Sequence, residues 1–392
     1  MSQITMGHGA GHAAHGAAGH GHGGSATDRA NVTMPDGWGK GLGGVLLLVG
    51  AACLAGTAAY PFLDSSDYAA KHALAAYLVG FTVALGLILG TLGIVMMWHL
   101  VKAGWSVTLR RQAENVASMV PLAIVLVAPI VAFAPKLYKW MNPELVKTDA
   151  VLAHKVGYLN PTFFYVRLAV YFVLWAVLSA RLVGLSRRQD ETGDKWLSNK
   201  MSFTSAWGIL LFALSVAFAG FDVIMSLDFH WFSTMWGVYF FAGNMISSLA
   251  IIVLCMSICR SAGRLRGVVT EDHYHDMGKL MLGFTVFWAY IGFSQYFLIW
   301  YANIPEETAW FLVRYGDGWK TLGIVMMFGH FVGPFLILLF RKVKRTPALL
   351  SLVASWIILM HCVDMFWVIR PMADPAFAMK LSWVDLTGLI GP

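Results

Sequence analysis

The sequence predicts an all-α membrane protein, a polytopic bundle of transmembrane helices. Of its 392 residues, 58% are hydrophobic and only 12% are charged, whereas a soluble domain carries about 25% charged residues. Apolar runs of about 20 residues recur along the chain, and a run of that length crosses a bilayer as a helix. The sequence lacks the alternating ten-residue pattern of a membrane β-barrel. These observations exclude an ordinary soluble domain.

Nine apolar segments are long enough to cross a membrane. Backbone groups cannot stay unpaired in hydrocarbon, so each segment is predicted to be helical. Pro61 and the basic run 341–345 mark two of the expected connections. The stretch 382–392 reads like the start of another apolar run, so we expect ten spans in the complete protein. The approximate cores of the nine segments are 41–60, 74–98, 116–134, 163–185, 204–225, 231–258, 279–301, 319–340 and 348–369.

Residues 1–40 form a tail that is rich in glycine, alanine and histidine. Such a segment cannot bury a core, so it is predicted to be disordered, while residues 41–392 form one transmembrane domain. Histidines between glycines can bind divalent metal loosely, and the alternative is a solvated tail without a selected role. The histidines of the tail are His8, His12, His15, His20 and His22.

The chain has a net charge of +7, and the positions of its positive charges predict how it is oriented in the membrane. Most lysines and arginines lie in the tail and in the connections after the second, fourth, sixth and eighth segments. The positive-inside rule places those parts, and therefore the N-terminus, in the cytoplasm. Positive charge in short loops between apolar runs indicates contact with anionic lipid and not with nucleic acid.

The cysteines argue against redox metals on this chain. Cys53, Cys255, Cys259 and Cys362 form no CxxC or CxxCH motif. Neither a c-type haem, an iron–sulfur cluster nor a structural zinc is therefore expected here, and no metal ligand is predicted.

Ionisable residues near the end of the fifth segment are the first functional candidates. A charge in hydrocarbon costs roughly 2.5–3.5 kcal/mol on insertion scales, so such residues are functional candidates by default. Asp222, Asp228 and His230 are predicted to form a proton-accepting cluster near the outer surface. The alternative is structural, with Asp228 capping the sixth segment.

The eighth and ninth segments contain further candidates. His361 and Asp364 lie three residues apart, hence on one helix face. An aspartate can orient a histidine, and the pair could pass protons or bind a quinone carbonyl. The alternative is an internal packing contact. His330 is the third member of this group, and its depth matches that of His361 within about 5 Å, so a b-type haem between them is geometrically possible. A typical dihaem cytochrome needs four well-placed histidines, which disfavours that alternative.

The seventh segment offers hydrogen-bond donors inside an aromatic-rich helix. Ser294 and Gln295 are therefore candidates for contact with a quinone, together with His361. Hydrogen bonding between helices is the alternative role. Glu306 and Glu307 follow Pro305 and are expected to begin a short surface helix.

Three motifs resemble one protein family. These are MSLDFHWFSTMWGVYFFAG (225–243), FWAYIGFSQYFLIWYANIPEETAWF (287–311) and HCVDMFWVIRP (361–371). They resemble ActF, quinone-binding subunit 2 of the bacterial alternative complex III, a quinol:cytochrome c oxidoreductase. The resemblance implies a ten-helix subunit of the inner membrane with two four-helix bundles, related to NrfD/PsrC-like membrane anchors. The echo of TLGIVMM at 91–97 and 321–327 suits a duplicated bundle.

The resemblance also implies the partners. Haems c and iron–sulfur clusters lie on other subunits, and the NrfD-like sister subunit ActC is the one thought to hold the quinol. We therefore expect an integral membrane subunit of a respiratory quinol:acceptor oxidoreductase that works with menaquinone or ubiquinone and binds no cofactor itself. Its expected partners are ActC, multihaem cytochrome c subunits, an iron–sulfur subunit and lipid.

The expected role of this subunit is a proton route. Asp222, Asp228 and His230 would serve its outer half, and His330, His361 and Asp364 its middle. A purely structural scaffold is the main alternative. A secondary transporter, which needs broken helices around a midplane site, and a b-type cytochrome are weaker alternatives.

Overall fold

The chain folds into a bundle of long parallel and antiparallel helices. The computed structural model describes residues 28–316, 318–373, 379 and 381–392, and every regular element in that part is helical. Nine segments of the described part are long and apolar enough to cross a membrane, which confirms the predicted multi-pass architecture. Their bounds are Lys40–Leu63, Ala69–Leu100, Gly104–Ala132, Pro161–Thr192, Trp196–Leu227, Trp236–Ser261, Glu271–Ala302, Trp319–Leu339 and Pro347–Met372.

Seven of these segments contain one long helix each. The helices are α2 (Lys40–Leu63), α3 (Ala69–Leu100), α10 (Pro161–Thr192), α11 (Trp196–Val223), α12 (Trp236–Ser261), α13 (Glu271–Ala302) and α18 (Pro347–Ile369).

The other two segments are interrupted where proline enters the helix. Proline has no N–H to donate, so the helical hydrogen bond at that position is lost. The third segment contains the short helices α4 (Val107–Ala117), α5 (Val120–Leu126) and α6 (Ala128–Ala132). The eighth contains α15 (Trp319–Met326), a π-helical turn, η4 (Met327–Val332), and α16 (Gly333–Leu339). Pro61, in contrast, lies inside α2 and does not end it.

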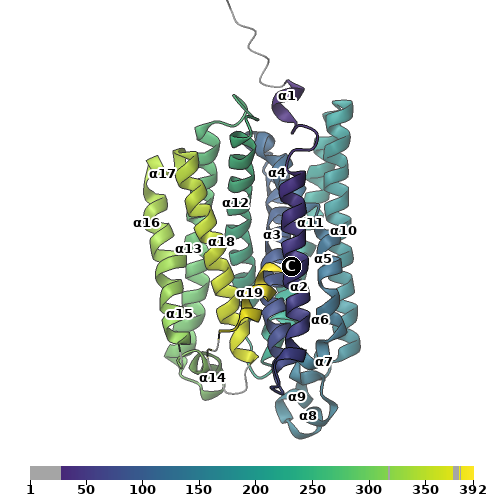
Figure 1. Cartoon of the computed structure of the whole chain (residues 1–392), viewed down its shortest axis with the longest axis vertical. Helices are drawn as coiled ribbons and strands as arrows, with labels where there is room; N and C mark the ends of the chain where they lie inside the picture. The colour runs from purple at the N-terminus through teal and green to yellow at the C-terminus, as the bar shows by residue number, and fades with distance from the viewer. Residues whose placement is uncertain (1–27, 317, 374–378, 380) are drawn as a thin grey trace, which may run out of the picture.

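Short helices lie at the two ends of the bundle (Figure 1). At the upper end of that view are α1 (Arg29–Val32) and α17 (Arg341–Arg345). At the lower end are α7 (Ala134–Leu137), α8 (Pro143–Thr148), α9 (Ala150–Lys155) and α14 (Pro305–Val313). The last helix, α19 (Trp383–Ile390), starts near the lower end and lies between α2 and α3.

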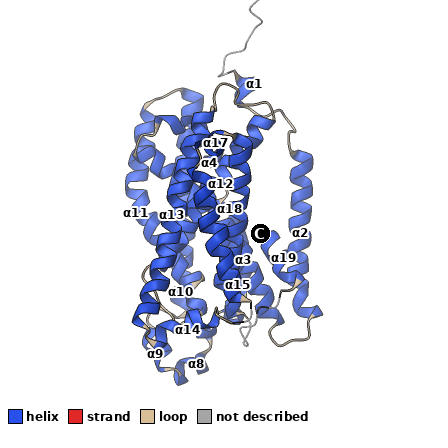
Figure 2. Ribbon diagram, turned by 90° about the vertical axis from the view of Figure 1, so that its left-hand side faces the viewer, coloured by secondary structure: helices blue, strands red, loops and turns tan. Residues whose placement is uncertain are grey.

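The long helices form two groups of four among the described residues. The first bundle contains α3, the α4–α6 segment, α10 and α11, and the second contains α12, α13, the α15–α16 segment and α18. The two bundles meet mainly where α3 packs against α12. In α3, 89% of the most apolar window is buried, whereas in α2 only 6% is buried. Therefore α3 is the centre of the molecule, and α2 stands at its edge (Figure 2). Many apolar side chains of α2 are exposed.

Glycine permits the close approach of α3 and α12. A Cβ atom at Gly86 would lie 2.3 Å from the side-chain oxygen of Asn244, and one at Gly90 would lie 2.2 Å from Ser248 Oγ. Small residues let the backbones of membrane helices come close enough for extensive packing. The interface between the two bundles therefore depends on these glycines.

The part of the tail that the structure describes is attached to the upper end. The backbone N–H of Leu265 donates to the Asn31 carbonyl (2.9 Å), and the Asn31 side chain donates to the Arg266 carbonyl (2.8 Å). This end of the predicted tail, residues 1–40, therefore contacts the connection that follows α12. The tail histidines lie in residues 1–27, outside the described residues.

Candidate functional site

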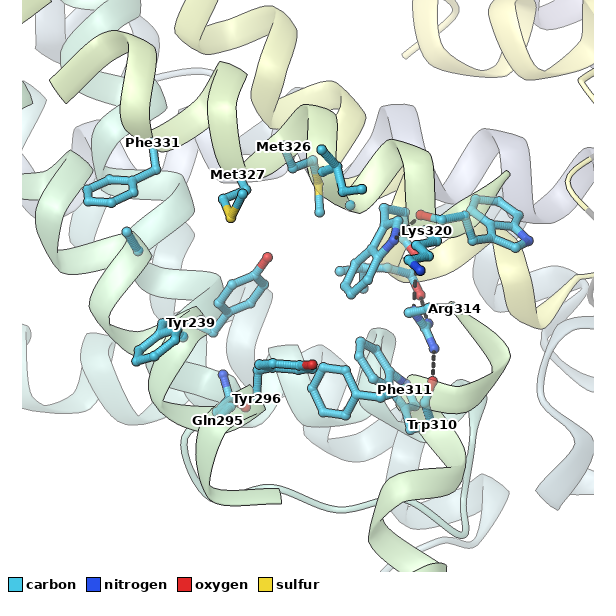
Figure 3. A pocket seen from close by; sticks show the side chains of 18 of the residues that line it. Tyr239, Gln295, Tyr296, Trp310, Phe311, Arg314, Lys320, Met326, Met327 and Phe331 are labelled. Carbon is cyan, nitrogen blue, oxygen red and sulfur yellow. Dashed lines mark hydrogen bonds between the residues drawn. The ribbon is translucent and has the colours of Figure 1, made fainter. Parts of the chain in front are cut away.

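A cavity of about 540 Å³ lies in the second bundle, close to its lower end. It is formed by α12, α13, α14, α15, the π-helical turn and α18 (Figure 3). Among the described residues, its wall contains two cationic side chains, Arg314 and Lys320, and no carboxylate. Its size falls in the range of small-molecule sites, about 300–1,000 Å³. The aromatic lining residues are Trp231, Trp236, Tyr239, Trp288, Phe293, Tyr296, Trp310, Phe311, Tyr315, Trp319, Phe331 and Trp367.

A buried carboxylate lies behind one wall of this cavity. Asp364 is fully buried on α18 and accepts a hydrogen bond from the Tyr239 hydroxyl of α12. It accepts another from Trp288 Nε1 of α13, at 3.1 Å. Tyr239 and Trp288 both line the cavity, so one hydrogen bond joins Asp364 to each of two residues of its wall.

Two buried histidines extend this cluster. His361 Nδ1 lies 3.9 Å from Asp364 Oδ2, and the ring centroids of His330 and His361 are 6.4 Å apart. The ring of Trp288 lies against that of His330, with centroids 4.1 Å apart. No described residue makes a hydrogen bond to any ring nitrogen of the two histidines. Buried polar groups normally have partners, often an ordered water, so these nitrogens are the natural place for bound water.

The π-helical turn and a glycine place the two imidazoles. π-Turns are frequent at functional sites, and this one directs His330 into the cluster while Met327 and Phe331 line the cavity. A Cβ atom at Gly243 of α12 would lie 2.9 Å from His361 Cε1. Only glycine therefore lets His361 sit where it does.

Arg314 closes the other end of the cavity. It follows α14, is 2% exposed, and lies over the Trp310 ring, with its guanidinium carbon 3.3 Å from the ring centroid. It donates to the backbone carbonyls of Trp310, Trp367 and Val368 at 2.8, 3.2 and 2.6 Å. Burial lowers the pKa of this guanidinium, yet an arginine stays protonated at any physiological pH.

The predicted quinone-contact residues lie in three different places. Gln295 lines the cavity and accepts a hydrogen bond from Ser233 Oγ at 2.8 Å. Ser294 is half-buried and does not line the cavity. His361 lies behind Asp364 and does not reach the cavity wall. Neither His330 nor His361 lines the cavity of about 540 Å³.

The structure separates Asp222 from the other two residues of the predicted outer cluster, Asp228 and His230, which remain in contact with each other. Asp222 is fully buried in the first bundle and binds Arg167 of α10 through two hydrogen bonds, of 2.8 and 2.7 Å. Tyr171 donates a third at 2.9 Å. Asp222 therefore forms a buried ion pair with Arg167. The sequence marked Asp222 as buried but did not reveal Arg167, which lies 55 positions away.

Asp228 and His230 lie instead in the surface connection at the lower end. His230 Nε2 is 2.8 Å from Asp149 Oδ2, at the start of α9. Asp228 accepts a hydrogen bond from the His230 backbone N–H, and because α12 begins at Trp236, Asp228 does not cap that helix. The backbone N–H of Leu152 and the His230 side chain hold the pKa of Asp149 below its ordinary value.

The sequence analysis missed Tyr239 and Arg314. Tyr239 lies inside one of the quoted motifs, but its neighbour Asp364 is 125 positions away. Arg314 is an isolated arginine after α14, and the sequence gives little indication that it is buried, because its burial depends on the ends of two helices. Within the described part, no three histidine, cysteine, aspartate or glutamate side chains lie close enough to hold a metal ion.

Comparison with known proteins does not assign the chain to a family. No protein-family model matches the sequence, and no curated protein is significantly similar to it.

Proposed function

We propose that this chain is an integral membrane subunit of a quinol:electron-acceptor oxidoreductase, the class that its motifs resemble. In this proposal the second bundle receives a quinol ring in the aromatic cavity and takes up its proton. The observation that supports it best is the hydrogen bond from Tyr239, on the cavity wall, to the buried carboxylate of Asp364. Flat aromatic side chains on several sides suit a flat ring, and a quinol is a ring that must lose protons when it is oxidised.

The proposed proton transfer starts at the cavity wall. A quinol hydroxyl beside Tyr239 gives its proton to the tyrosine oxygen while the tyrosine proton passes to Asp364. The O–H bond of the quinol breaks, the ring keeps the electron pair as an anion, and Asp364 becomes neutral. The proton then moves to His361 and His330 through water between their bare ring nitrogens. His330, His361 and Asp364 are the middle group predicted from the sequence.

The electrons leave to other subunits in this proposal. Multihaem cytochrome c and iron–sulfur subunits, together with the NrfD-like sister subunit, are the partners that the resemblance implies. Menaquinone and ubiquinone both have a ring of the required kind. We place the protein in the inner membrane of a bacterium in this proposal, with the basic upper end of the bundle in the cytoplasm.

Substitution of the two acceptor residues tests this function. We expect Asp364→Asn and Tyr239→Phe to lower quinol turnover and proton release by about 10²-fold or more, the contribution of a positioned acid or base. Turnover and proton release are measured on the intact complex in proteoliposomes. Glu114→Gln is the matched control, because Glu114 is a buried carboxyl of the first bundle that pairs with Arg111 at 2.8 Å.

Two outcomes would contradict the proposal. Unchanged turnover and proton release in both variants, with the complex assembled, would remove the proton route. Loss of partner subunits from the purified complex, with normal turnover in what remains assembled, would instead support the structural scaffold.

A further inference from the structure

We propose that the cavity holds its ring ligand as an anion, with an ionised ring oxygen bound by Arg314 and Lys320. This inference rests on the proposed function for the ring, and it adds the charge state and the residues that select it. The ligand class is an acidic hydroxyquinone, whose ionised hydroxyl lies at the edge opposite one of its ring carbonyls.

The cavity has two chemically different ends. Tyr239, with Asp364 behind it, lies on one side, and Arg314 and Lys320 lie on the opposite side (Figure 3). Between them the wall is almost entirely aromatic and aliphatic. A ring that fits between these ends meets a proton acceptor at one edge and positive charge at the other.

The charge of Arg314 is only partly compensated by the protein. No carboxylate of the described residues forms an ion pair with it, and its three hydrogen bonds go to backbone carbonyls. Those carbonyls belong to the C-terminal ends of α14 and α18, where the helix dipole carries about half a negative charge. A guanidinium has five N–H donors, so two remain after these three bonds.

A buried charge is normally paired, because the low dielectric makes an unpaired one costly. Asp228 acts on Arg314 only from beyond ion-pair distance, and the described cavity wall contains no carboxylate, so a ligand anion would bring negative charge closer. Lys320 is exposed at the same end and adds a second positive charge. A neutral quinone would only accept hydrogen bonds from Arg314 and Lys320, whereas an anion would also be attracted by their positive charges.

The order of events follows from this arrangement. When the quinol proton leaves through Tyr239, negative charge develops on the ring. That charge lies on the oxygen at the Tyr239 edge, so Arg314 and Lys320 do not bind it and favour the step only through their positive charge across the ring. Both residues act on the ring by binding it, and neither takes its proton.

The test compares two ring probes that differ in charge. The purified chain, in nanodiscs of phosphatidylcholine, is titrated with a 2-hydroxy-3-alkyl-1,4-naphthoquinone and with its neutral 2-methoxy ether. Quenching of the tryptophan fluorescence reports binding, because six tryptophans line the cavity: Trp231, Trp236, Trp288, Trp310, Trp319 and Trp367. We expect the hydroxy probe to bind about tenfold more tightly when its hydroxyl is ionised, and this preference to disappear at a pH where it is protonated.

Variants connect the preference to the cationic end. Arg314→Gln is expected to remove most of the preference and Arg314→Lys to keep part of it, with little change for the methoxy ether. Because Arg314 also holds the ends of two helices, Arg314→Gln could fail to fold. Lys320→Gln, at an exposed position, then serves as the second variant and is expected to lower the preference by a smaller factor.

Equal affinity for the two probes at every pH would overturn the inference, as would a preference that both Arg314→Gln and Lys320→Gln leave unchanged. Displacement of the ionised probe when phosphatidylglycerol replaces phosphatidylcholine would also overturn it, because an anionic lipid headgroup would then be the ligand of the cationic end. If both probes bind equally, the proposed function still stands on the Asp364 and Tyr239 variants. If neither probe binds, the cavity assignment of the proposed function fails with it.

Discussion

His361 reaches the central cluster only because α12 has no side chain at position 243. The Cβ atom of any other residue there would lie within 2.9 Å of the imidazole. The helix that presents His361 also presents Asp364 one turn later, so a displaced imidazole would move relative to the carboxylate that it approaches. Gly243 is therefore a sensitive test of the proton route.

We expect Gly243→Ala to destabilise the chain by about 1–3 kcal/mol, the usual cost of an overpacked core. We also expect lower quinol turnover in the complex that still assembles, since the imidazole must shift. Thermal unfolding of the purified chain and turnover of the complex measure the two effects.

Gly283→Ala is the control for that substitution. Gly283 is an exposed helical glycine of α13, and a Cβ atom there meets nothing within 4 Å. Alanine is the better helix former by up to about 1 kcal/mol, so no loss of stability is expected. Equal behaviour of the two variants would show that the contact with His361 has no consequence.

Side-chain partners were the least predictable part of the candidate site. The spacing of His361 and Asp364 placed both on one face of a helix, and the structure confirms that they lie close together. The spacing of Asp222, Asp228 and His230 did not bring those three together. The chain turns sharply after α11. Asp222 and His230 find partners in distant parts of the sequence, whereas Asp228 stays beside His230.

The existence of the helices could be predicted from the sequence better than the irregular turns within them. All nine predicted spans exist, because a run of about 20 apolar residues has no other stable form in a bilayer. The expected short helix after Pro305 is also present, as α14. The π-helical turn before Pro334 was not predicted, since its pattern depends on neighbouring helices that re-satisfy the backbone.

The α8–α9 hairpin is held at the lower end by Asp149. This residue caps α9 by accepting from the Leu152 N–H at 3.0 Å, and it also binds His230. Its pKa is lowered in the folded protein, so the carboxylate contributes its stabilisation at neutral pH. That contribution is lost only as the pH falls below the ordinary value of 3.8.

Hydrogen exchange of α9 tests this anchor. We expect Asp149→Ala to speed exchange at residues 150–155 at neutral pH, and Asp149→Asn, which can still cap, to speed it less. Glu144→Gln in the same hairpin is the control, because its ion pair with Lys147 is exposed on both sides and contributes little. Unaltered exchange in Asp149→Ala would show that other contacts hold the hairpin.

The arrangement of the two bundles explains why polar residues can be buried here. Each bundle surrounds its own polar contacts, Arg167 with Asp222 in the first and Asp364 with its donors in the second. The repeated heptapeptide lies late in α3 but at the start of α15, so its two copies occupy different depths although both helices run upward. The repeated heptapeptide therefore does not mark equivalent positions of the two bundles.

Cysteine labelling tests the predicted orientation. In a variant without the four native cysteines, Lys342→Cys lies at the upper end and Glu306→Cys at the lower end, both exposed. We expect a membrane-impermeant maleimide to label only Glu306→Cys in intact cells and both positions after the cells are opened, as the positive-inside rule requires. The reverse pattern in intact cells would place the N-terminus outside.

The sequence alone determined that the chain is helical, that it crosses a membrane nine times within the described residues, and which ionisable residues lie in apolar surroundings. These properties follow from composition and local periodicity, which act over one helix at a time. Only the tertiary structure decided that Tyr239 and Trp288 meet Asp364, that Asp222 pairs with Arg167, and that Arg314 faces an aromatic cavity. Each of these contacts joins different helices, and in lipid the packing of small residues selects helix partners where local hydrophobicity cannot.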